Sequence, residues 1–104
     1  MTLPPHGIEW ATPADCGFTP ADCRQYLPRT VLFGCVPGLV MYAIDRARLG
    51  DGYVVFYNPA LPDGTFSGAP NRPIWTPTVA TVEEAQALAL GHAAALAEAA
   101  TLVG

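Results

Sequence analysis

The central part of the chain, residues 30–58, constrains the fold most strongly because it holds three apolar runs separated by turn signals. Each run is rich in the β-branched and aromatic residues that favour strands. The runs are TVLFGCV (30–36), LVMYAID (39–45) and YVVFYN (53–58). Pro37-Gly38 separates the first two, and Gly50-Asp51-Gly52 suits the positive φ angles of a tight hairpin connection. We therefore expect consecutive strands here, with an antiparallel hairpin over residues 39–58.

Both faces of these strands are apolar. Along the second run, the side chains of one face alternate with those of the other: Val40, Tyr42 and Ile44 with Leu39, Met41 and Ala43. A sheet with one solvated face would alternate apolar with polar residues instead. One face can pack on a helix. The other must be covered by the N-terminal segment, by a proline-rich loop, by a second copy of the chain or by a partner.

The C-terminal segment predicts one helix over residues 82–101. Thr81 is the expected N-cap, and Glu84 is the returning carboxylate of a capping box. At helical spacing, one stripe is expected to face the sheet: Ala85, Leu88, His92, Leu96, Ala99 and Leu102 or Val103. The opposite side holds Gln86, Ala87, Leu90, Ala94 and Ala97. We expect His92 to be a neutral core histidine that is hydrogen-bonded to a strand carbonyl or a tyrosine hydroxyl.

The helix start, ATVEEAQALA (80–89), resembles the start of the final helix in small bacterial and phage proteins that combine a β-sheet with a helix. The resemblance implies a capped helix and no particular function.

The segment between the third run and the helix, residues 59–80, holds five prolines. It predicts an ordered or binding loop with a short edge strand near 72–76, where prolines are tolerated. Aromatic and arginine side chains are the composition of interface hot spots. The candidate partner-binding residues are therefore Tyr57, Phe66, Asn71, Arg72 and Trp75. The alternative role for Trp75 is to anchor the loop on the sheet.

The N-terminal segment, residues 1–29, is proline-rich and contains the sequence TPADC twice, at 12–16 and 19–23. In each copy, threonine can cap a helix, proline can occupy the first helical position, and the aspartate can accept from free backbone N–H groups. We interpret the repeat as two helix starts, the second running to Leu27, whose cysteines fill a small N-terminal core.

Composition excludes several classes of function. Charged residues make up only 13% of the 104 residues, the net charge is −4, and all five basic residues are arginines. Only Arg46 and Arg48 are close in sequence, so no basic stripe for nucleic acid is expected. The start MTLPPHG lacks a secretion signal, and the apolar run Val31–Ile44 is too short to span a bilayer. We expect a cytoplasmic protein without membrane contact.

The residues that could carry chemistry form no motif. Histidine and cysteine are residue types that bind zinc, and the candidates here are His6, Cys16, Cys23 and Cys35. Their spacing is unlike the close pairs of ligands in zinc fingers. No activating motif surrounds any cysteine, and the aspartates lie at turns and caps. We therefore expect no catalytic residue, no metal site and no cofactor.

We predict a single α+β domain over residues 1–104. A three- to four-stranded, mainly antiparallel sheet packs on one C-terminal helix, with a short N-terminal helix and proline-rich segments. Residues 1–29 are the irregular N-terminal segment, 30–80 the sheet and proline-rich loop, and 81–104 the helix.

The function we expect is a small acidic, non-enzymatic protein-binding module. It would act as an inhibitor or as an immunity or anti-defence protein of a bacterium or phage, through the apolar sheet face or the proline-rich loop. A homodimer is one such case, in which the bound partner is a second copy of the chain. The alternative is a small-molecule-binding or catalytic domain with an aromatic pocket lined by Tyr42, Tyr53, Tyr57 and Trp75.

Overall fold

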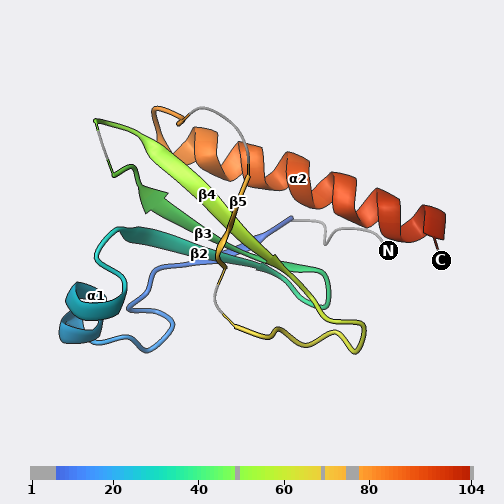
Figure 1. The fold of residues 1–104 in the computed structure, drawn as a ribbon, viewed down its shortest axis with the longest axis horizontal. Helices are drawn as coiled ribbons and strands as arrows, with labels where there is room; N and C mark the ends of the chain where they lie inside the picture. The colour runs from blue at the N-terminus through green and yellow to red at the C-terminus, as the bar shows by residue number, and fades with distance from the viewer. Residues whose placement is uncertain (1–6, 49, 69, 75–77, 104) are drawn as a thin grey trace.

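The computed structural model describes residues 7–48, 50–68, 70–74 and 78–103, and it has the expected α+β class (Figure 1). Within these ranges, five antiparallel strands form one sheet in the order β1-β2-β3-β4-β5, so each strand pairs with its neighbours in sequence. The elements are β1 (Glu9–Ala11), α1 (Pro20–Tyr26), β2 (Thr30–Val36), β3 (Val40–Arg46), β4 (Tyr53–Pro59), β5 (Arg72–Pro73) and α2 (Val82–Val103). Helix α2 runs along one side of the sheet, and α1 lies at the opposite side (Figure 1).

The three central strands match the apolar runs to within one residue, and glycine turns separate β2 from β3 and β3 from β4. Gly38, with φ 74°, lies in the turn between β2 and β3. Gly50 and Gly52 have φ angles of 73° and 117° in the connection between β3 and β4. A side chain at Gly52 would also meet the carbonyl oxygen of Val79 at 2.8 Å. The predicted hairpin is therefore confirmed.

The expected number of strands was too low, because the N-terminal segment contributes the edge strand β1. This strand has only three residues and includes a charged one, so it has no clear apolar pattern. It is held by a cross-strand pair in which Trp10 lies opposite Gly34. A Cβ atom at Gly34 would lie 2.6 Å from the indole ring, so the ring occupies the space above the glycine.

The opposite edge is the two-residue strand β5, Arg72–Pro73. It begins where the short edge strand was expected. The remaining part of that prediction, from Trp75, lies outside the described residues.

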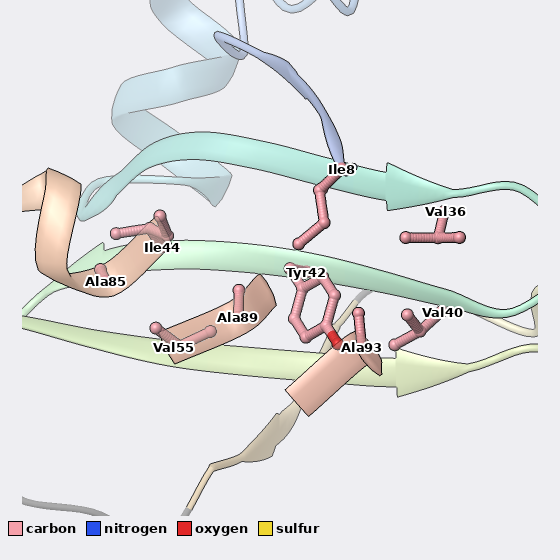
Figure 2. Close-up of a cluster of buried hydrophobic side chains, with 9 residues drawn as sticks. All are labelled: Ile8, Val36, Val40, Tyr42, Ile44, Val55, Ala85, Ala89 and Ala93. Carbon is pink, nitrogen blue, oxygen red and sulfur yellow. The ribbon is translucent and has the colours of Figure 1, made fainter. Parts of the chain in front are cut away.

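The core lies between the sheet and α2. Nine buried residues form it: Ile8, Val36, Val40, Tyr42, Ile44, Val55, Ala85, Ala89 and Ala93 (Figure 2). Figure 2 shows that the fully buried residues of α2, Ala85, Ala89 and Ala93, place their methyl groups among the side chains of β3 and β4. Small side chains at the contact allow the helix backbone to approach the strands closely.

The predicted inner stripe of α2 was displaced. Its centre is a ridge of alanines four residues apart that ends at Ala97, which is 5% exposed and was expected on the opposite side. Ala99, expected to face the sheet, is exposed. Leu88 and Leu96 are half-buried and flank the ridge. The helix is apolar nearly all round, so close packing of small residues decides which face is inside.

Three threonines cap helical turns. Glu84 N donates to Thr81 Oγ1 at 3.1 Å, as expected, although the Glu84 carboxylate accepts from Ala80 N rather than from Thr81 N. In both TPADC copies the aspartate N–H donates to the threonine hydroxyl, and the threonine N–H donates to the aspartate carboxylate. The interpretation of the repeat as two caps is confirmed.

The first TPADC copy makes a single turn that ends at Gly17, where φ is 94°. The second copy begins α1. The expected N-terminal core of cysteines was wrong, because Cys16 is exposed and Cys23 is only half-buried. A one-turn helix has too little surface to cover its own cysteine.

Candidate functional site

The candidate site lies on the sheet face turned away from α2, which we call the far face. Side chains alternate along a strand, so the neighbours of the buried Tyr42 and Ile44 point to this face. The strand register aligns them in rows across the sheet: Ala11, Phe33, Ala43 and Phe56 in one row, and Glu9, Cys35, Met41 and Asn58 in the next. The far face is therefore mostly apolar, as the strand patterns indicated.

Two segments overhang the far face from opposite edges. From the N-terminal side, the ring of Phe18 lies 6.0 Å from that of Phe33. From the other side, the proline-rich loop is tied down by Asn58, which is 8% exposed and donates from Nδ2 to the carbonyl oxygen of Gly68 at 2.9 Å. The loop is internally ordered, since Thr65 donates to the Asp63 carboxylate from both its N–H and its hydroxyl. The two segments cover this face only in part.

Between the two segments lies a cavity of about 600 Å³, which we call the apolar hollow. Ligand sites in proteins commonly occupy roughly 300–1,000 Å³. Among the described residues, Glu9 is the only charged one that lines it. The other lining residues come mainly from three parts of the chain: Phe33, Cys35 and Met41 of the sheet; Cys16, Phe18 and Leu27 of the N-terminal segment; and Gly68 and Pro70 of the loop. Such a lining can accept an apolar group.

The cysteine thiol on the floor of the hollow is not activated. Burial raises the pKa of Cys35, and the negative charge of Glu9 adds to this effect. A thiol with a raised pKa remains protonated near neutral pH and is a poor nucleophile. Within the described ranges, no three histidine, cysteine or acidic side chains are grouped so that they could hold a metal ion. His6, one of the candidate ligands, lies outside those ranges.

The expected aromatic pocket is not on the far face. Tyr42 is fully buried beside α2, and its hydroxyl lies 2.8 Å from Nδ1 of His92, as the sequence predicted. The ring of Tyr57 lies 4.5 Å from that of His92. Burial raises the pKa of the Tyr42 hydroxyl and lowers the pKa of His92. Together with Tyr53, these tyrosines pack against the core under α2, and Trp75 lies outside the described residues.

The structure brings together some of the candidate partner-binding residues. Tyr57 and Arg72 are cross-strand partners in β4 and β5. Phe66 is half-buried in the proline-rich loop, and Asn71 is exposed just before β5. None of these four lines the apolar hollow. Of the residues that do line it, Phe33, Cys35 and Met41 could be found in the sequence, as part of the second face of their strands.

A second hollow of about 650 Å³ lies at the end of the sheet where β3 finishes. We call it the arginine hollow, because Arg29, Arg46 and Arg48 line it together with one acidic residue, Asp45, and the apolar Val54 and Phe56. Sequence reasoning missed this cluster. Pairing of the β2 and β3 ends places Arg46 N 2.8 Å from the carbonyl oxygen of Arg29, although the two residues are far apart in sequence.

Comparison with known proteins gives no relative. The chain matches no protein-family model, no curated protein and no solved structure. No helix in the described part of the chain is long and apolar enough to cross a membrane. The proposed function therefore rests on the geometry of the far face.

Proposed function

We propose that this chain is a small acidic, non-enzymatic binding protein, and that the apolar hollow accepts an apolar segment of a partner protein. The observation that carries the proposal is an open cavity of about 600 Å³ with a nearly uncharged lining, left between the two segments that partly cover the far face. A monomer rarely exposes apolar surface of this kind unless it binds something there.

The residue types around the hollow favour a protein segment as the ligand. Aromatic residues and methionine are enriched at protein interfaces, and Phe18, Phe33 and Met41 supply them here. Phe18 is 38% exposed and forms part of the wall, so a partner could bury it further. A polar substrate would need converging polar groups to fix its orientation, and the lining does not supply them.

The wider function follows the same reasoning. A small chain that covers an apolar segment of another protein can act as an inhibitor, or as an immunity or anti-defence protein of a bacterium or phage. Phe66 and Asn71 lie in the segment that forms one rim of the hollow, where they would add contacts around the central apolar contact. Three free cysteines fit a reducing compartment such as the cytoplasm.

A small apolar molecule is the second candidate ligand. The volume of the hollow favours it, because this volume lies within the range of small-ligand sites. Native mass spectrometry of the purified protein separates the two candidates. A retained small molecule would favour this one, whereas an unliganded chain that binds peptides would favour the protein segment.

Selection from a random-peptide phage library tests the main proposal. We expect the wild-type chain to enrich peptides with clustered apolar residues, and Met41→Gln to lose this enrichment. The matched control is Leu90→Gln, because Leu90 is 44% exposed on α2 and lies away from the hollow. Enrichment that Met41→Gln retains, or no enrichment by the wild-type chain, would contradict the proposal.

A further inference from the structure

Four of the five basic residues of the chain gather at one end of the sheet. Arg29 precedes β2, Arg46 ends β3, Arg48 follows it, and Arg24 lies in α1. Arg29, Arg46 and Arg48 line the arginine hollow, and Arg24, Arg29 and Arg46 line an adjoining hollow of about 560 Å³. Because two arginines are common to both hollows, the four form one continuous basic surface, which we call the arginine surface.

Asp45 also lines the arginine hollow, but within the described part of the chain none of the four guanidinium groups forms an ion pair. Four arginines against one carboxylate give the two hollows an excess of positive charge. The two nearest acidic residues in sequence are hydrogen-bonded to threonines. The Asp45 carboxylate accepts from the Thr30 hydroxyl at 2.8 Å, and the Asp22 carboxylate accepts from Thr19 N at 3.1 Å. Arginine stays protonated at any physiological pH, so this surface presents permanent positive charge.

The arginine surface continues into the apolar hollow. Leu27 lines both the apolar hollow and the adjoining arginine-lined one. Val54 and Phe56 give the arginine hollow an apolar lining on the far face. A ligand that spans both regions therefore needs an apolar part and a negatively charged part next to each other.

We infer that the partner segment is acidic, with carboxylates that bind the arginine surface while its apolar side chains fill the apolar hollow. This inference rests on the proposed function and specifies its ligand. Arginine binds carboxylates through two parallel N–H···O bonds, which adds orientation to the attraction. Opposite charge also accelerates association of the partner.

Nucleic acid fits the same surface less well. A phosphate backbone is an extended polyanion that needs a long basic track. The four arginines here are confined to one end of a chain whose net charge is −4. The apolar lining and the adjacent apolar hollow match a peptide better than a sugar-phosphate chain.

The test repeats the phage selection with Arg29→Gln/Arg46→Gln. The matched control is Arg72→Gln, because Arg72 is an exposed arginine in β5 at another part of the sheet. We expect the wild-type chain and Arg72→Gln to enrich peptides with aspartate or glutamate beside apolar residues. The double variant should enrich apolar peptides without that acidic excess. A synthetic acidic peptide from the selection should bind the double variant about tenfold or more weakly, and more salt should weaken its binding to the wild-type chain.

The outcomes separate this inference from the proposed function. Two outcomes would overturn the inference and leave the proposed function in place. In the first, the wild-type chain selects apolar peptides that lack acidic residues. In the second, the peptides selected by the double variant still carry an excess of acidic residues. No enriched peptides at all would overturn both. A thymidine oligonucleotide that displaces the selected peptide and binds more tightly would assign the surface to nucleic acid and overturn the inference. Thermal unfolding of each variant verifies that it is folded.

Discussion

At the scale of single residues, the Tyr42–His92 pair is the main polar link between the sheet and α2. The tyrosine hydroxyl is buried, so it needs a hydrogen-bond partner, and the imidazole 2.8 Å away supplies one. Burial of His92 favours the uncharged ring, which lowers its pKa. The pair therefore contributes to stability only while the histidine remains neutral.

This link makes stability depend on pH. The pKa of His92 in the folded protein lies below the unfolded value of 6.5, so the unfolded chain binds the proton more readily. The contribution is fully present above pH 6.5, and it is lost as the pH falls from 6.5 through the lower folded-state pKa. Urea unfolding at about pH 7.5 and about pH 5 measures this loss.

The control for this measurement is His92→Gln, which keeps a hydrogen-bonding side chain but cannot titrate in that range. We expect the free energy of unfolding to fall more on acidification in the wild-type chain than in the variant. Equal losses in both proteins would show that His92 does not cause the pH dependence.

A second prediction concerns Gly34, where the ring of Trp10 fills the space of a side chain. Gly34→Ala would place a methyl group 2.6 Å from the ring. The indole must then shift, and we expect a loss of about 1–3 kcal/mol in the free energy of unfolding.

The matched substitution is Gly91→Ala in α2, where no atom lies within 4 Å of the new Cβ apart from the adjoining residues and the nearby helix backbone. Alanine has the higher helix propensity, so this variant should gain up to about 1 kcal/mol. Chemical unfolding of both variants measures the two changes. A Gly34→Ala protein as stable as the wild type would contradict the described contact.

At the scale of elements, the alanine ridge determines how α2 packs on the sheet. Ala85, Ala89 and Ala93 are fully buried against the side chains of the strands, and the larger Leu88 and Leu96 flank them. A leucine on the ridge would have to move the helix away from the sheet.

Ala89→Leu should therefore lower the free energy of unfolding by about 1–3 kcal/mol. Ala94→Leu makes the same change on the exposed side of the helix and should alter stability by no more than about 0.5 kcal/mol. Urea unfolding compares the two variants. Similar effects at both positions would mean that the ridge is not the packed face.

Prediction from sequence succeeded for elements whose signals are local. The three central strands are bounded by proline or glycine turns, and the caps at Thr12, Thr19 and Thr81 involve residues three positions apart. Prediction failed where contacts between distant parts of the chain determine the structure. The strand β1 exists because Trp10 packs on Gly34. The inner face of α2 is set by alanines whose apolar character does not distinguish them from their neighbours.

At the scale of the whole molecule, the far face could be predicted only as a surface to be covered. Alternation along the strands identified Met41 and its neighbours as a second apolar face. The hollow itself depends on how the N-terminal segment and the proline-rich loop meet over that face, which no local pattern encodes. The arginine surface likewise requires the β2–β3 register that brings Arg29 beside Arg46.

The central claim is that the partner binds in the apolar hollow of the far face. Chemical-shift mapping of the ¹⁵N-labelled chain, titrated with a peptide from the wild-type selection, tests it most directly. We predict that the largest amide shifts fall on Phe18, Phe33, Cys35 and Met41, while Ala94 on the outer side of α2 is unchanged. Shifts centred on the outer side of α2, with those four amides unmoved, would contradict the claim.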